Sequence, residues 1–163
     1  MPVGYRMSSG NNAKLVAAGM RFRGGPFDES DSSHLSSLAP VGPLTGDPEG
    51  PNWNGHVWSA WATIAEAATL PAGAVGLYRI RGQSGLALLY VGEGAVRGRV
   101  RQHLAKTRKL GHRQGVIFGD AKLAASWVLN PAWHDHLRLE LENDLIAAHL
   151  VETGCVPPAQ FLG

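Results

Sequence analysis

The chain has 163 residues, of which 44% are hydrophobic, and its formal net charge is +2 at pH 7. This length accommodates one domain of about 100 to 150 residues with an extension, and it argues against two full domains. No apolar run approaches the ~18 residues that a membrane span needs, so we expect a cytoplasmic protein without a membrane partner. The single cysteine, Cys155, excludes an internal disulfide framework and a multi-cysteine zinc site.

Charge is strongly segregated along the chain. Residues 1–75 carry four basic and six acidic side chains, residues 76–119 carry nine and one, and residues 120–163 carry two and six. Between Gly94 and Gly119 there are seven Lys or Arg residues, two His and no acid. A basic segment of this kind is typical of a polyanion site, although a solvated helix face gives the same pattern.

The N-terminal third predicts an irregular arm followed by one helix. Fifteen of the 29 residues from 24 to 52 are Gly, Pro or Ser, which indicates that residues 1–52 form an arm or linker. From residue 53 onward, apolar side chains recur at helical spacing, and Pro71 would end the helix. This stripe, which predicts an accessory helix over residues 53–70, consists of Val57, Trp61, Ile64 and Ala68.

Three short apolar runs predict a small sheet. Residues 76–81 and 86–92 flank Gln83-Ser84-Gly85 and read as a β-hairpin, and residues 124–129 read as a third strand. The second run is apolar without alternation, which favours a sheet covered on both faces. We therefore expect residues 53–163 to form an α/β domain with a mainly antiparallel three-stranded sheet flanked by helices.

The basic segment predicts a helix from Ala95 to about Lys109, followed by a Gly-rich and basic loop over residues 110–120 that would close on a ligand. An apolar row must face the sheet, which places one basic row beside the sheet edge and another toward solvent. The apolar row consists of Val96, Val100 and Leu104. The basic row beside the sheet edge consists of Arg99, His103 and Lys106, and the row toward solvent consists of Arg97, Arg101 and Arg108.

The last predicted helix runs to about Thr153 and is stopped by Gly154. It carries Glu142 in the gap between two apolar rows. A carboxylate in such a place is costly unless a cation or hydrogen-bond donors meet it. Two partners are open: Arg138, one helical turn earlier, or a divalent metal ion.

The order of these features resembles the GIY-YIG nuclease superfamily. The likeness runs roughly from Pro71 to Gln160 and rests on Gly76-Leu77-Tyr78, Tyr90-Val91-Gly92, Arg99, His103 and Glu142-Asn143-Asp144-Leu145-Ile146. In that superfamily, a glutamate in a Glu-x-x-Leu-Ile pattern is the lone protein ligand of Mg²⁺ or Mn²⁺. The resemblance therefore implies a metal-dependent endonuclease that hydrolyses DNA, with RNA not excluded as a substrate.

The resemblance also assigns catalytic roles, which the chemistry of phosphodiester hydrolysis supports. Glu142 would hold the metal, and the always-charged Arg99 would clamp the non-bridging phosphate oxygens. Tyr78 or His103 would position and deprotonate the attacking water, and Tyr90 would hydrogen-bond the phosphate or the water. Contacts to the nucleic-acid backbone are expected from Arg97, Arg101, Lys106, Arg108, Lys109, Arg113 and Gln160.

The chain departs from the superfamily pattern at three places. Glu93 follows the second motif where many relatives have Lys, Gln160 stands in place of an Asn after Pro157, and residues 110–122 look like an insertion. These departures leave open a nucleic-acid-binding module that has lost turnover. A third hypothesis is a protein that recognises another protein through its Trp-rich helix. The sequence makes no prediction of oligomeric state.

Overall fold

The computed structural model describes residues 44, 46–83, 87–119 and 122–162, all of which belong to the compact unit Leu38–Gly163. Most of the predicted arm therefore lies outside the described residues. The elements, in chain order, are η2 (Trp53–Gly55), β1 (Ala62–Thr63), α2 (Ile64–Ala67), β2 (Val75–Gly82), β3 (Leu88–Ala95), α3 (Val96–Thr107), α4 (Arg113–Phe118), β4 (Leu123–Leu129) and α5 (Asp135–Thr153). None of the helices in these residues has the length and apolar character needed to cross a membrane.

The predicted α/β fold with an antiparallel sheet is confirmed, but the described residues contain four strands rather than three. The strand order is β1-β4-β2-β3, so β2 and β4 are central and β3 is an edge strand. The predicted hairpin is present, with Tyr78 opposite Gly92 in the β2–β3 register. The additional strand, β1, pairs antiparallel with β4.

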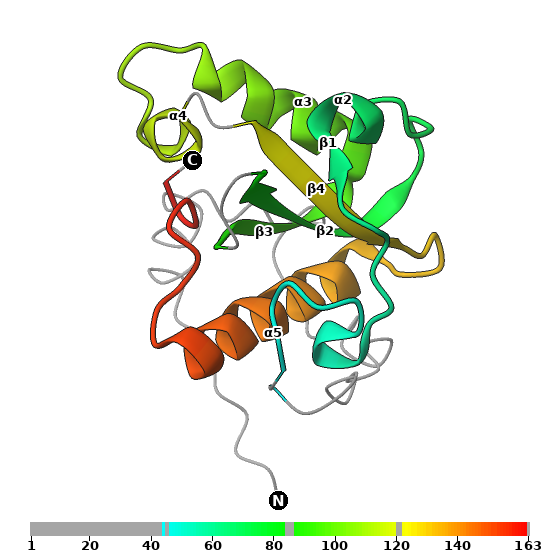
Figure 1. Ribbon diagram of the computed structural model, residues 1–163. Coiled ribbons are helices and arrows are strands. Elements are labelled where there is room, and N and C mark those ends of the chain that lie inside the picture. The colour runs from blue at the N-terminus through cyan, green and yellow to red at the C-terminus, as the bar shows by residue number, and fades with distance from the viewer. Residues whose placement is uncertain (1–43, 45, 84–86, 120–121, 163) are drawn as a thin grey trace, which may run out of the picture. The chain divides into compact units, whose positions relative to one another are not determined.

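Helices cover both faces of the sheet, as the unbroken apolar strand predicts (Figure 1). Residues alternate between the faces along β2. Tyr78 and Ile80 pack with α2, α3 and α4 on one face, whereas Leu77 packs with α5 and the Trp53–Trp58 segment on the other. We call these the α3 face and the α5 face.

The predicted helix over residues 53–70 is wrong. The segment contains the short η2, an extended stretch, β1 and α2. Helix α2 begins only at Ile64, where Thr63 and Glu66 form a reciprocal capping box that fixes the helix start. Val57, predicted to face the core, is 77% exposed, whereas Trp53 and Trp58 are buried. The buried indoles lie in the core, so the proposed Trp-rich recognition helix has no counterpart here.

The predicted loop after α3 contains a helix, α4. The His112 side chain caps its N-terminus by accepting a hydrogen bond from the Gly115 amide at 3.3 Å. Gly115 also lets the two helices approach closely, because a Cβ there would lie 2.2 Å from the Lys106 carbonyl oxygen. This tertiary packing stabilises a helix of six residues that is too short for its periodicity to be read from sequence.

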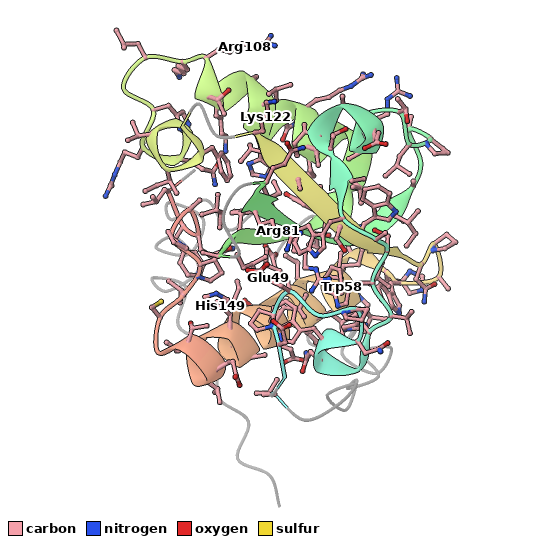
Figure 2. All side chains as sticks on the ribbon, viewed as in Figure 1. Glu49, Trp58, Arg81, Arg108, Lys122 and His149 are labelled. Carbon is pink, nitrogen blue, oxygen red and sulfur yellow. The ribbon has the colours of Figure 1, made fainter. Side chains whose placement is uncertain are left out.

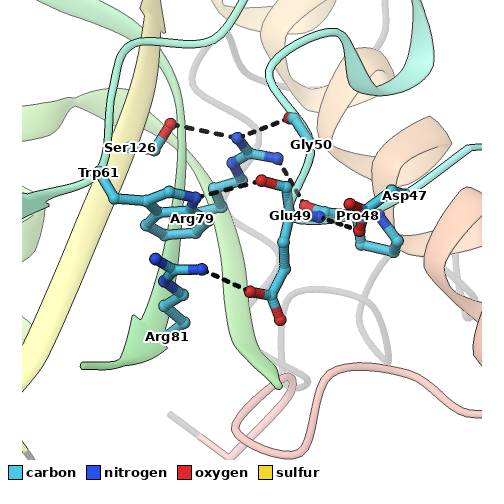
Figure 3. A network of polar contacts seen from close by, with 8 residues as sticks. All are labelled: Asp47, Pro48, Glu49, Gly50, Trp61, Arg79, Arg81 and Ser126. Carbon is cyan, nitrogen blue, oxygen red and sulfur yellow. Dashed lines mark hydrogen bonds and ion pairs between the residues drawn. The ribbon is translucent and has the colours of Figure 1, made fainter. Parts of the chain in front are cut away.

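Residues 46–52, assigned from sequence to the arm, are part of the domain because they enclose Arg79 on the α5 face (Figure 3). Arg79 is 1% exposed, and burial lowers its pKa while Asp47 and Glu49 oppose that shift. The contacts of its guanidinium are Pro48 O at 2.5 Å, Gly50 O at 2.9 Å, Ser126 Oγ at 3.4 Å, and the rings of Trp58 and Trp61 at 4.3 and 4.6 Å. Sequence reasoning missed this buried cation.

The free edge of β3 is met by residues near the C-terminus. The Ala159 amide donates to Leu89 O at 2.9 Å, and the Val91 amide donates to Gln160 Oε1 at 3.2 Å. Helix α5, which precedes this segment, ends as predicted at Gly154, whose φ of 79° suits a glycine at a helix C-terminus. The segment therefore packs beside the strand that carries Tyr90.

Candidate active site

Three of the predicted catalytic side chains meet on the α3 face. Tyr78 comes from β2, Tyr90 from β3 and His103 from α3. The Tyr78 hydroxyl lies 2.8 Å from His103 Nε2, and the rings of Tyr90 and His103 have centroids 4.5 Å apart. Val96 and Val100 are fully buried against the sheet, which turns His103 of the neighbouring row toward the two tyrosines.

Two glycines of β3 make room for this group. A Cβ on Gly92 would lie 2.5 Å from the Tyr78 hydroxyl oxygen and from its Cζ, so the tyrosine ring occupies the space of the missing side chain. Gly94 has a φ of 115°, and a Cβ there would lie 3.1 Å from Arg99 Nε. The glycine of the second motif therefore has a direct packing role beside Tyr78.

Burial sets the protonation of the aromatic groups. It lowers the pKa of His103 to about 4, with Lys106 and Arg99 adding to that effect, so the imidazole is neutral near pH 7. Burial raises the pKa of Tyr90 to about 12 and that of Tyr78 well above its ordinary value. Glu142 raises both phenol pKa values and Arg99 lowers both, which places these two charges within electrostatic reach of the tyrosines.

Glu142 lies on α5, the helix that covers the other face of the sheet, and its charge raises the pKa of both tyrosines. Burial and the negative charge of Glu93 raise the pKa of Glu142 to about 7, and Arg99 opposes this shift. Within the described part of the chain, no Lys, Arg or His lies within ion-pair distance of this carboxylate. Glu142 is thus a half-buried acid without an ion-pair partner among the described residues.

The ion pair that sequence offered as one alternative, Arg138 with Glu142, does not form. Arg138 Nε instead donates to Glu93 Oε2 at 2.9 Å, and Nη2 donates to Asp135 Oδ1 at 2.5 Å. The other Glu93 oxygen lies 3.7 Å from Arg99 Nη2. Glu93 is therefore bound mainly by Arg138 of α5. The Arg99 side chain is 49% exposed and remains accessible to a ligand.

Gln114 joins the group although sequence reasoning placed it in a loop. It lies on α4, is 1% exposed, and its Oε1 is 3.1 Å from His103 Nδ1. Lys106 donates to the same oxygen at 2.8 Å, so this predicted DNA contact is engaged inside the domain. No local sequence signal links Gln114 to His103, because the contact depends on how α4 packs against α3.

The remaining basic residues form the exposed surface that was predicted. Arg101, Arg108, Lys109 and Arg113 are exposed and Arg97 is half-buried; Arg108 lies at the outer end of α3 (Figure 2). Arg101 also donates to Ala68 O at 3.2 Å. Gln160 differs from the prediction: it is 6% exposed and binds the β3 backbone through Oε1, a structural contact rather than an exposed one.

Mg²⁺ and Mn²⁺ prefer oxygen ligands, such as carboxylates and water. In the ranges that the structure describes, no group of three or more His, Cys, Asp or Glu side chains could hold an ion. A carboxylate that is partly desolvated and lacks an ion-pair partner fits a hard divalent cation whose other ligands are waters and substrate oxygens. Glu142 is the residue that would hold such an ion.

Comparisons of this chain with known protein families, with curated protein sequences and with solved structures give no match. Tyr78, Tyr90 and His103 are in contact; Arg99 acts electrostatically on all three, and Glu142 acts on the two tyrosines.

Proposed function

We propose that this protein is a metal-dependent endonuclease that hydrolyses DNA phosphodiester bonds at a site of the GIY-YIG type. One observation carries the proposal: Tyr90 packs on His103, whose Nε2 lies 2.8 Å from the Tyr78 hydroxyl, and the charges of Glu142 and of the half-exposed Arg99 both act on these two phenols. A site with this charge arrangement suits a phosphate group accompanied by a cation. The hydroxyl–imidazole pair of Tyr78 and His103 adds the groups needed for proton transfer.

Phosphodiester hydrolysis requires relief of the negative charge on the phosphoryl oxygens. The guanidinium of Arg99 is always charged and presents donors in a planar fork that matches two phosphate oxygens. Its half-exposed position lets it reach a ligand without first breaking a short ion pair, because the nearest carboxylate oxygen is 3.7 Å away. A Mg²⁺ or Mn²⁺ ion held by Glu142 would supply further positive charge beside the phosphate.

The attacking water must lose a proton, and Tyr78 and His103 provide the path. The water proton moves to Tyr78 Oη as the phenol proton moves to His103 Nε2, 2.8 Å away. The products of this step are a hydroxide equivalent bonded to phosphorus, a neutral tyrosine and an imidazolium. Because the pKa of His103 is lowered to about 4, the imidazolium gives its proton back readily, which suits protonation of the leaving oxygen.

Tyr90 is positioned to orient the substrate. It is half-buried, lies against both Tyr78 and His103, and its pKa is raised to about 12, so it remains a neutral hydrogen-bond donor. A neutral phenol donates to a phosphate oxygen without adding charge. Tyr90 therefore complements Arg99 as a second donor to the scissile phosphate.

Binding of the flanking DNA is assigned to the exposed basic residues of α3 and of the α3–α4 region. Contacts of this kind reach phosphates and carry no sequence information. The affinity should therefore fall with salt, with a slope of about −0.9 for each phosphate contacted on duplex DNA. Loss of Arg108 or Arg113 should lower this slope and leave the cleavage step intact.

A plasmid assay tests the proposal. Purified protein is incubated with supercoiled plasmid and either Mg²⁺, Mn²⁺ or a chelator, and the nicked and linear products are measured. We expect metal-dependent nicking that is abolished in Glu142→Ala and Arg99→Ala. Matched controls are Glu140→Ala, an exposed acid on the same helix, and Lys122→Ala, an exposed cation directly before β4. Cleavage that persists in Glu142→Ala would rule out this site.

A DNA-binding module without turnover is the second candidate, and Glu93 favours it. Its carboxylate adds negative charge next to Glu142 and lies near Arg99. In the same assay, salt-sensitive binding without cleavage, in the wild type and in Glu93→Lys alike, would support this candidate.

A further inference from the structure

The amide of Gln114 has a single chemically consistent orientation. Its nitrogen donates to the Ala159 carbonyl at 2.9 Å, which can only accept. On the other side, its oxygen accepts from the Lys106 ammonium at 2.8 Å, which can only donate. If the two amide atoms were exchanged, the amide nitrogen would face the Lys106 ammonium, donor to donor, and the amide oxygen would face the Ala159 carbonyl, acceptor to acceptor. Gln114 Oε1 must therefore face α3.

This orientation determines the proton on His103. Gln114 Oε1 lies 3.1 Å from His103 Nδ1, and an amide oxygen requires a donor there. The neutral imidazole carries one proton, which must then reside on Nδ1. His103 Nε2 is left with a free lone pair, and the Tyr78 hydroxyl at 2.8 Å becomes the donor of the bond between them.

We propose that Gln114 is a positioning residue that holds neutral His103 in the Nδ1–H tautomer, so that Nε2 is ready to receive the Tyr78 proton. This inference rests on the proposed nuclease function for its catalytic meaning. The alternative tautomer would place a proton between Nε2 and Tyr78 and would block that transfer. Gln114 is 1% exposed, and its effect on the reaction is exerted through His103.

The surroundings of His103 suit this role. The ionisable side chains that face it are Tyr78 from β2, Tyr90 from β3, and Lys106 and Arg99 from its own helix. The ring of Phe118 has its centroid 5.4 Å from that of His103. Among these described neighbours no carboxylate contacts the ring, so a neutral amide holds the tautomer without stabilising the imidazolium.

The tautomer is measured directly by long-range ¹H–¹⁵N NMR on the full chain at about pH 8, where neutral imidazoles dominate. The His103 signals are assigned by their loss in His103→Asn. Two other histidines serve as internal references. His149 Nδ1 lies 2.6 Å from the Cys155 carbonyl oxygen and must therefore be protonated. His112 Nδ1 accepts a hydrogen bond from the Gly115 amide and must therefore be unprotonated.

We expect His103 in the wild type to resemble His149, with Nδ1 protonated. Gln114→Met removes the acceptor at similar length and should shift His103 toward the Nε2–H form, while Gln114→Glu keeps an acceptor and should retain Nδ1–H. Observation of Nε2–H in the wild type would overturn the proposal, and this measurement needs no Gln114 variant to fold. An unchanged tautomer in folded Gln114→Met would also overturn it.

Kinetics separate positioning from plain stability. If the wild-type protein cleaves DNA, Gln114→Met should lower kcat about 100-fold or more and leave KM unchanged. Proton transfer would be impaired, whereas the contacts to DNA would remain. Gln114→Glu should recover part of that loss. If kcat is unaffected when the tautomer has shifted, the catalytic role is wrong. If the wild type cuts no DNA but the tautomer depends on Gln114, the proposed function fails and the structural assignment holds.

Discussion

Glu93 and Arg138 join the end of β3 to the start of α5 through a hydrogen-bonded ion pair of 2.9 Å. Arg138 is 8% exposed, so this pair is shielded from water. It compensates the charge of Glu93, one of the three departures from the GIY-YIG pattern. Arg99 consequently remains separated from Glu93 by 3.7 Å and is available to a phosphate.

Removing the charge of Glu93 should destabilise the protein more than removing the charge of Asp135. Both carboxylates pair with Arg138, but the Glu93 side chain is 12% exposed and that of Asp135 is 60% exposed. We expect Glu93→Gln to cost about 1–3 kcal/mol and Asp135→Asn about 0–1 kcal/mol. Urea denaturation of the two variants measures the difference. Equal losses would contradict the shielding of the Glu93 pair.

Stability should decrease as pH rises from about 4.5 to about 7. In the folded state the pKa of Glu142 is raised from 4.5 to about 7, so the folded protein keeps a proton that the unfolded chain has released. The loss should reach at most about 3 kcal/mol and should level off above the folded pKa. Glu142→Gln should remove this component, whereas Glu140→Gln, on the exposed side of α5, should retain it. Denaturation midpoints at several pH values provide the test.

A divalent ion should stabilise the protein in a Glu142-dependent way. An ion that binds only the folded state adds about 2.7 kcal/mol at a free concentration of about 100 Kd. We expect Mn²⁺ to raise the Tm of the wild type and of Glu140→Gln, but not that of Glu142→Gln. Calorimetry at pH values above 7, where Glu142 is ionised, gives the largest effect. An equal rise in all three proteins would place the ion elsewhere.

Gly92→Ala should displace Tyr78. The new Cβ would lie 2.5 Å from the tyrosine hydroxyl, and the ring is 1% exposed with no room to retreat. Overpacking of this kind costs about 1–3 kcal/mol and should break the bond to His103. Gly98→Ala is the control, since nothing lies within 4 Å of its Cβ and alanine favours a helix. Thermal denaturation should show opposite shifts for the two variants.

Arg79→Met should unfold or strongly destabilise the domain without touching the candidate site. The substitution leaves the carbonyls of Pro48 and Gly50 buried without their donor, which we expect to cost about 3–5 kcal/mol. Arg81→Met is the comparison, because the Arg81 side chain is 20% exposed and donates to the Glu49 carboxylate rather than to buried carbonyls, so its loss should cost less than that of Arg79. Similar chemical-denaturation midpoints for the two variants would argue against the buried role of Arg79.

The sequence predicted those features that repeat locally. The hairpin follows from two short apolar runs around a turn, α3 and α5 follow from helical periodicity, and the three helical rows correctly placed Val100 in the core and His103 beside it. Tyr78 and Tyr90 lie on one face because Tyr78 and Ile80 share that face of β2 and Tyr90 pairs with Ile80. Whether these residues catalyse a reaction stays a prediction.

What the sequence did not predict depends on contacts between distant segments. Strand β1 exists because it pairs with β4, and α4 exists because Gly115 packs on α3. Gln114 reaches His103 only through that packing, and Arg79 donates from Nη1 and Nη2 to carbonyls about 30 residues earlier in the chain. Composition and periodicity do not indicate contacts between distant segments. For the same reason, residues 46–52 were assigned to the arm.

The contacts of Ala159 and Gln160 have a practical consequence for anyone who trims or tags this protein. These two residues form hydrogen bonds with backbone groups of the edge strand β3, which could otherwise pair with a strand of another molecule. Ala159 also accepts the bond that orients Gln114. Shortening the chain before Pro157 would therefore be expected to promote self-association and to loosen the side chain of His103 at the same time.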